Sequence, residues 1–167
     1  MDTCQRLITI RFSELKDAAR LMELDHLVWD RNTAPEPLNW ESREHYLLHC
    51  PPGSQLVAVT DSEEIAGYLG FRPPTGLDSS AHVYELWIAV DPAFQRQGIG
   101  SRLMHAFQKA ARQEGKSKLR LRVLSSNPRA IAFYRSCGFK EEGRLVREYC
   151  VQGRYLDDIL MSCFLSD

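Results

Sequence analysis

The sequence contains no apolar run long enough to cross a membrane. A bilayer-spanning helix needs about 18 or more consecutive apolar residues, and no segment approaches that length. The first residues, MDTCQRLITIRF, also lack the basic-then-apolar pattern of a secretory signal. We therefore expect a cytoplasmic protein without a membrane partner.

The sequence also lacks the cysteine and histidine spacings of a disulfide framework or a zinc site. The cysteines are odd in number and show no CxxC pair; they are Cys4, Cys50, Cys137, Cys150 and Cys163. His45 and His49 are one helical turn apart, but HYLLH has no central glutamate and no third ligand is evident. We expect reduced thiols and no bound metal.

There is little excess charge of either sign, since the net charge is −1 and 26% of the 167 residues are charged. This composition favours a single domain over residues 1–167 and gives no general case for nucleic-acid binding. The basic residues are nevertheless concentrated between Arg96 and Arg122, where only Glu114 opposes them. Without interleaved aromatic residues, this block is not typical of a nucleic-acid module. A solvated helix face and a local anion site both remain open.

Local patterns predict the element order β, α, α, β, β, β, α, β, α, β, β, which is a mixed sheet with helices on its faces. Ser13, Asn39 and Asn127 are the expected N-caps of the first, second and last helices. Gly115 and Gly138 are the expected stops of the last two helices. The predicted strands are 6–12, 55–60, 64–72, 82–90, 118–124, 145–151 and 154–165.

The glycine-rich stretch QRQGIGS, residues 95–101, lies between a predicted strand and a predicted helix. It is not a P-loop, because the GxxxxGK[ST] spacing is absent. It is not a dinucleotide fingerprint either, because Leu103 replaces the third glycine and Lys118 stands where an acid is needed. Glycines allow close backbone approach, and the first N–H groups of a helix bind pyrophosphate. A plain tight turn is the alternative.

Two motifs resemble the GCN5-related N-acetyltransferase family. VDPAFQRQGIGSRLM resembles its acetyl-CoA motif, and NPRAIAFYRSCGF resembles the Asn…Ala…Tyr…Gly-Phe segment that follows the next strand. GRYLDDILM is similar to the C-terminal strand of the branch that acetylates amino acids and protein N-termini. The resemblance covers about residues 55–165. It implies an α/β fold whose mixed, mostly antiparallel sheet splays between the fourth and fifth strands and is flanked by about four helices.

The same resemblance implies that acetyl-CoA is the co-substrate and lies in the gap between the splayed strands. Backbone near Ile88 and Val90 would pair with pantetheine, and the N–H groups from Gln97 to Ser101 would hold the pyrophosphate. The full set implied in acetyl-CoA binding is Ile88, Val90, Gln95, Arg96, Gln97, Gly98, Ile99, Gly100, Ser101, Asn127, Ala130 and Tyr134.

Two residues are candidates for the chemistry, which the resemblance implies is direct attack of an amine on the thioester without an acyl-enzyme. Tyr134 matches the position of the family's catalytic tyrosine and would protonate the departing thiolate as a general acid; a core tyrosine is the alternative. Glu85 interrupts the apolar run YELWIAV. It is either the base that takes the amine proton or a partner in an ion pair with Arg72 or Arg120.

The acceptor is expected to be a small-molecule or peptide amine. The resemblance places its recognition at about residues 24–40 and at EYCVQGRY. Acidic and aromatic residues there would suit a cationic amine, although solubility and packing explain them as well; they are Asp25, Asp30, Glu36, Trp29 and Trp40. An amino acid or a peptide N-terminus is favoured. A polyamine, an aminoglycoside, a catalytically inactive CoA-binding sensor and a homodimer through the C-terminal strands remain open.

Overall fold

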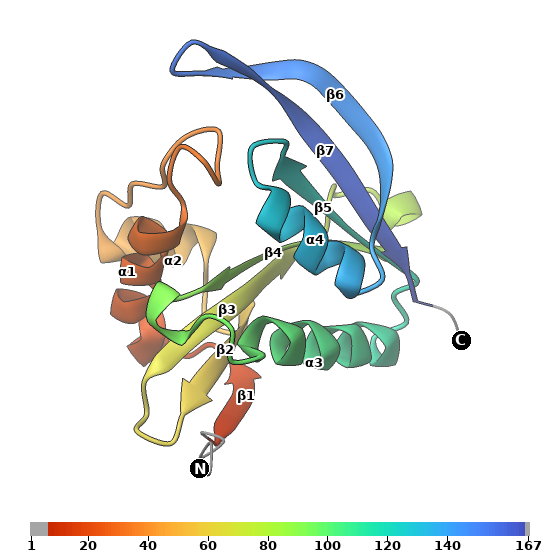
Figure 1. The fold of residues 1–167 in the computed structure, drawn as a ribbon. Coiled ribbons are helices and arrows are strands. Elements are labelled where there is room, and N and C mark those ends of the chain that lie inside the picture. The colour runs from red at the N-terminus through yellow and green to blue at the C-terminus, as the bar shows by residue number, and fades with distance from the viewer. Residues whose placement is uncertain (1–6, 166–167) are drawn as a thin grey trace, which may run out of the picture.

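The computed structural model describes residues 7–165, which form a seven-stranded sheet with four α-helices (Figure 1). The strands are β1 (Ile8–Phe12), β2 (Gln55–Thr60), β3 (Ile65–Arg72), β4 (Val83–Val90), β5 (Lys118–Leu124), β6 (Lys140–Val151) and β7 (Arg154–Phe164). The α-helices are α1 (Ala18–Val28), α2 (Arg43–His49), α3 (Ile99–Gln113) and α4 (Pro128–Ser136). The predicted element order and the mixed α/β class are confirmed.

The sheet splays between β4 and β5, as expected. These strands form the sheet's parallel pair, and their pairing runs only from Val83 to Glu85 on β4. Beyond Glu85, β4 continues to pair with β3 as far as Val90, while β5 pairs with β7 along its whole length. The backbone of β4 after Glu85 therefore has no strand partner on its β5 side.

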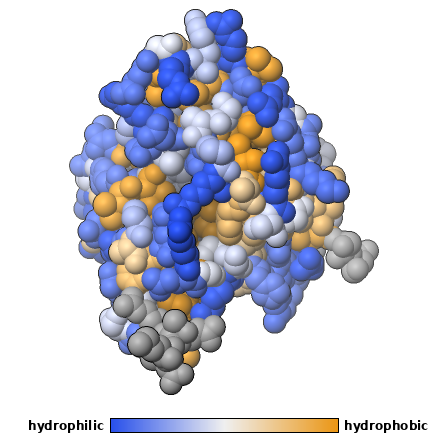
Figure 2. Space-filling view, in the orientation of Figure 1, coloured by the Kyte–Doolittle hydropathy of each residue, from blue (hydrophilic) through white to orange (hydrophobic). Residues whose placement is uncertain are grey.

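The helices cover opposite faces of the sheet (Figure 1). The amphipathic helix α3 packs one stripe, including Leu103 and Phe107, against one face, and α4 adds Tyr134 to the same core. On the other face, α1 and α2 bury a second cluster that includes Leu21, Leu24 and Tyr46. Figure 2 shows apolar residues in the middle of the drawn face, around α4, bordered by hydrophilic residues. No helix within residues 7–165 is long and apolar enough to cross a bilayer.

Two of the predicted helix caps are wrong. Ser13 does not cap α1, because its hydroxyl instead accepts the Gly53 N–H at 3.2 Å, and a 3-10 turn capped by Glu14 and Asp17 precedes the helix. Asn39 does not cap α2; the helix begins after Ser42, whose Oγ accepts the His45 N–H at 3.0 Å.

The late start of α2 has a tertiary cause. The indole of Trp40, directly after Asn39, donates to Asp25 on α1 at 2.8 Å. This contact between distant segments holds the chain in a loop where the sequence allows a helix to begin.

The third cap and both stops are confirmed. Asn127 Oδ1 accepts the Ala130 N–H at 3.2 Å, and Gly115 and Gly138 have φ values of 78° and 92°. Strand β6 begins at Lys140, five residues earlier than predicted at 145. Most of this edge strand is exposed on both faces, so pairing with β7 determines it rather than any alternation of apolar residues.

Candidate active site

The first cavity lies where β4 separates from β5 and where α3 and α4 begin. Its volume is about 430 Å³. Ten of the predicted acetyl-CoA residues line it, namely Ile88, Val90, Gln95, Arg96, Gly98, Ile99, Gly100, Ser101, Asn127 and Ala130. Gln97 and Tyr134 are not among its lining residues. Val28, Thr33, Phe94, Arg129 and Phe133 also line it, and sequence reasoning missed them.

Only some of these omissions were visible in the sequence. Arg129 and Phe133 belong to the NPRAIAFY motif, and a basic residue beside a helix start was a usable signal for an anion site. Val28 and Thr33 come from the end of α1 and the loop after it, and no local pattern links them to the glycine turn.

The glycine turn leaves three backbone donors at the start of α3 without a helical partner. Gly98 is the N-cap and has φ +74°, a left-handed conformation that glycine adopts without strain. The first helical hydrogen bond runs from Arg102 N to Gly98 O at 3.1 Å. The N–H groups of Ile99, Gly100 and Ser101 therefore lie at the positive end of the helix dipole. A Cβ on Gly100 would lie 3.1 Å from the Phe133 ring, so α4 packs closely over this turn.

Tyr134 is buried on α4, with 5% of its surface exposed. Its ring centroid lies 5.5 Å from that of Phe133 and 5.9 Å from that of Phe139. Burial, with a smaller effect from Cys137, raises the pKa of the Tyr134 phenol. Within residues 7–165 the hydroxyl makes no hydrogen bond, and its oxygen is not fully buried. It is a protonated donor without a protein acceptor.

Glu85 is the last residue of β4 that pairs with β5, where it lies opposite Arg120. Its carboxylate contacts Arg72 Nη2 at 3.1 Å and Arg120 Nη2 at 3.3 Å. The side chain is 11% exposed and lines neither cavity. The structure thus contains the ion pair that the sequence left open as an alternative, and both Arg72 and Arg120 take part in it.

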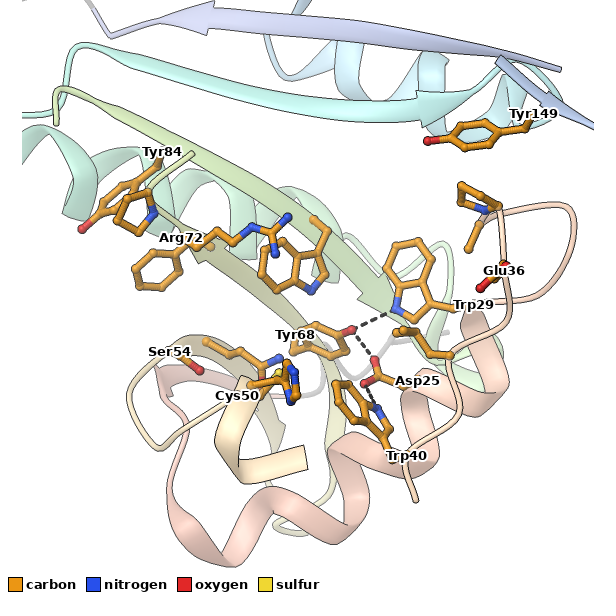
Figure 3. A pocket seen from close by; sticks show the side chains of 18 of the residues that line it. Asp25, Trp29, Glu36, Trp40, Cys50, Ser54, Tyr68, Arg72, Tyr84 and Tyr149 are labelled. Carbon is orange, nitrogen blue, oxygen red and sulfur yellow. Dashed lines mark hydrogen bonds between the residues drawn. The ribbon is translucent and has the colours of Figure 1, made fainter. Parts of the chain in front are cut away.

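A second, larger cavity of about 1040 Å³ lies on the face of the sheet that carries α1 and α2 (Figure 3). Its walls come from α1, the loop after it, α2, β2, β3, β4 and β6. All three tryptophans of the chain, Trp29, Trp40 and Trp87, line it. In Figure 3, Tyr149 of β6 lies at the top of the view, above Trp29, Tyr68 and Trp40. This cavity covers the segments in which acceptor recognition was expected.

A hydrogen-bonded chain of aromatic side chains surrounds Asp25 in this cavity. The Tyr68 hydroxyl donates to Asp25 Oδ1, and Trp40 Nε1 donates to Asp25 Oδ2 at 2.8 Å. Trp29 Nε1 in turn donates to the Tyr68 hydroxyl at 2.9 Å. Burial raises the pKa of Asp25, and the hydrogen bonds from Tyr68 and Trp40 oppose that rise. Asp25 and Tyr68 are 43 residues apart, so only the fold brings them together.

Much of the basic block is engaged within the fold. Arg102 and Lys116 donate to the carbonyls of Ile8 and Ala81. Lys118, Arg120 and Arg122 pair with the carboxylates of Glu142, Glu85 and Asp158. These contacts tie α3 and β5 to neighbouring segments of the fold. The rings of His45 and His49 meet edge to face with their centroids 4.9 Å apart, and no group of three or more metal-binding side chains occurs in residues 7–165.

Comparison with known proteins agrees with this geometry. Residues 19–139 match the Acetyltransferase (GNAT) family. The chain belongs to this family. N-alpha-acetyltransferase RimI of Mycobacterium tuberculosis is 32% identical over 153 residues, which is 87% of each chain. L-methionine sulfoximine/L-methionine sulfone acetyltransferase of Salmonella typhimurium is 25% identical over 169 aligned positions, 96% of each. The solved structure of smu.2055 from Streptococcus mutans superposes with a TM-score of 0.86 at 28% identity, covering 95% of this chain and 99% of that one.

The protein is therefore an acetyl-CoA-dependent N-acetyltransferase, and the smaller cavity fits its co-substrate. Three unpaired N–H groups at a helix start suit a pyrophosphate. The unpaired side of β4 after Glu85 offers backbone groups to the amides of pantetheine. Acetyl-CoA supplies the activated acetyl thioester.

Proposed function

We propose that the protein acetylates the α-amine of a free amino acid or of a peptide or protein N-terminus. The observation that carries this proposal is that the two cavities adjoin along the chain. Val28 and Thr33, at the end of α1 and in the loop after it, line the cavity that fits acetyl-CoA, while their neighbours Trp29 and Ala34 line the larger one. On β4, Ile88 and Trp87 line the two cavities from opposite faces of the strand. An amine in the larger cavity would therefore approach a thioester held along β4. The names of the M. tuberculosis and Salmonella relatives also point to α-amines.

The protonation of the acceptor favours an α-amine over a lysine side chain. At pH 7 a lysine amine with a pKa near 10.4 needs about 4.6 kcal/mol to lose its proton, whereas about 10% of an α-amine with a pKa near 8 is already neutral. The carboxylates that line the larger cavity are Asp25, already accepting two hydrogen bonds, and Glu36 on the exposed loop. An α-amine therefore needs less help from a base than a lysine side chain does.

We assign Tyr134 as the general acid, because a buried phenol with a raised pKa and no protein acceptor can donate to the departing thiolate. Glu85 was the candidate base. Its contacts with Arg72 and Arg120 favour a different role, which is to hold the point where β4 and β5 separate. A backbone N–H of β4 after Glu85 would stabilise the oxyanion.

The test is a CoA-release assay over matched amines. Methionine and a short peptide are expected to turn over, whereas N-α-acetylmethionine and N-α-acetyllysine are not, because their α-amines are blocked. Spermidine and an aminoglycoside complete the panel. Faster turnover of either of these than of every α-amine would refute the proposed acceptor class. Acetyl-CoA binding without release by any amine would support the sensor alternative.

A further inference from the structure

The larger cavity contains a buried carboxylate without a cationic partner. Asp25 is 2% exposed. Arg72, the arginine on the cavity wall, is already paired with Glu85. Within residues 7–165, no salt bridge involves Asp25 or the other acidic lining residue, Glu36. The lining of the cavity therefore contains two carboxylates without a salt-bridge partner, while the charge of its one arginine is balanced by Glu85.

The partners of Asp25 are neutral and aromatic. Tyr68 and Trp40 each donate one hydrogen bond, to different carboxylate oxygens. A carboxylate oxygen can accept more than one hydrogen bond, so a cation that donates to Asp25 would add to these neutral donors. A buried charge with only neutral donors is costly, and a cation beside it would offset that cost. The rings of Trp29, Trp40 and Tyr68 also offer their faces to a cation.

The amide of Gln55, which also lines the larger cavity, has a donor without a hydrogen-bond acceptor. Gln55 is 1% exposed, and its Oε1 accepts the Tyr46 hydroxyl at 2.9 Å. Its Nε2 is buried with no hydrogen-bond acceptor. A buried donor without a partner is destabilising, and an oxygen that entered the cavity would accept its hydrogen bond. An acceptor that carries a carbonyl or carboxylate next to its ammonium has one group suited to Asp25 and one suited to Gln55.

The position of this pair suits the transfer. Tyr68, which donates to Asp25, lies directly opposite Ala89 in the β3–β4 pairing. Ala89 belongs to the part of β4 that has left β5, between Ile88 and Val90 of the smaller cavity. The Asp25 network thus lies beside the strand that would present the thioester.

We propose that Asp25, held by Tyr68 and Trp40, binds the ammonium group of the acceptor, and that Gln55 Nε2 donates to the oxygen of the adjacent carbonyl or carboxylate. Asp25 is then a specificity-determining residue, and the acceptors are α-ammonium compounds with an apolar side chain that fits among the indoles. This inference rests on the proposed function, because it names the chemistry by which the acceptor is recognised.

The test measures binding and needs no catalysis. Since every tryptophan of the chain lines the cavity, intrinsic tryptophan fluorescence reports its occupancy directly. The probes are phenethylammonium and its neutral near-isostere 2-phenylethanol, titrated with and without CoA. The wild type is expected to bind the cation about tenfold more tightly than the alcohol. Asp25→Asn is expected to remove that preference, with the affinity for the alcohol changed less than twofold.

Two controls separate charge from structure. Tyr68→Phe removes one hydrogen bond to Asp25 but leaves its charge, so the preference for the cation should persist. L-methioninamide and 3-(methylthio)propylamine differ by the carboxamide next to the amine, and Gln55→Leu should weaken only the former.

Three results would overturn the inference. The first is equal wild-type affinity for the cation and the alcohol, and the second is no saturable fluorescence change with the cation under either condition. The third is an equal loss of both probes in Asp25→Asn, which would make Asp25 a clamp for the two indoles and no more. The CoA-release assay is independent of all three, so failure of the proposed function is recognised separately.

Discussion

Gly70→Ala is expected to damage the acceptor cavity and spare the acetyl-CoA site. Gly70 of β3 lies opposite Trp87 of β4, and the Trp87 indole folds over it. A Cβ at Gly70 would lie 2.5 Å from Trp87 Nε1 and closer still to the neighbouring ring atoms. Since ordinary contact begins near 3.4 Å, the indole must move by about 1 Å.

The size of the effect follows from that displacement. Overpacking of this kind costs about 1–3 kcal/mol, which lowers the Tm of a domain of this size by about 2–10 °C. Losing one well-placed aromatic contact costs about 1–1.5 kcal/mol, or about tenfold in the KM for the acceptor. Acetyl-CoA affinity should be unchanged, because Trp87 and Gly70 do not line the smaller cavity.

The assay combines thermal unfolding, steady-state kinetics of CoA release and the tryptophan emission spectrum. Gly76→Ala is the matched control, because a Cβ there would meet nothing within 4 Å and the loop should absorb it. If Gly70→Ala leaves the acceptor KM and the tryptophan emission of the wild type intact, the assignment of the larger cavity to the acceptor is refuted.

Three further substitutions address the chemistry and the fold. Tyr134→Phe should lower kcat at least tenfold with acetyl-CoA binding retained, because the thiolate loses its proton donor; an unchanged kcat would remove Tyr134 from the mechanism. Glu85→Gln should lower the Tm through its two arginines but leave the shape of the pH–rate profile unaltered, whereas loss of the acidic limb would restore Glu85 as the base. For Asp17, burial acts to raise the pKa, but the Arg11 guanidinium at 2.7 Å and the Glu14 N–H outweigh it and lower the pKa. The stabilisation from this pair is therefore full above the unfolded pKa near 3.9 and is lost as the pH falls through the lower folded value. In urea unfolding, the advantage of the wild type over Asp17→Asn should be about 1–3 kcal/mol at pH 7 and should shrink below pH 4; an advantage that does not change with pH would contradict this account.

Local signals predicted the turn and the helix start that line the smaller cavity, because the relevant residues are close in sequence. The turn 95–101 and the helix start at Asn127 carry their own caps, glycines and unpaired N–H groups. Their caps and glycines act locally, although Phe133 packs over Gly100 and Ile99 is buried in the core. Local signals failed at Ser13 and Asn39, which do not cap the helices they precede. The Ser13 hydroxyl instead accepts a hydrogen bond from Gly53, and Trp40, next to Asn39, donates to Asp25 of another helix.

The sequence by itself determined the order of the elements, the glycine turn and the helix starts that line the smaller cavity, since these follow from backbone preferences over a few residues. Only the tertiary structure decided which groups Asp25, Gln55 and Glu85 contact. Each is a polar residue whose role depends on which charges and donors surround it, and those neighbours come from strands and helices far along the chain. Electrostatic interactions depend on distance and on burial, so the environment of these residues follows only from the folded structure.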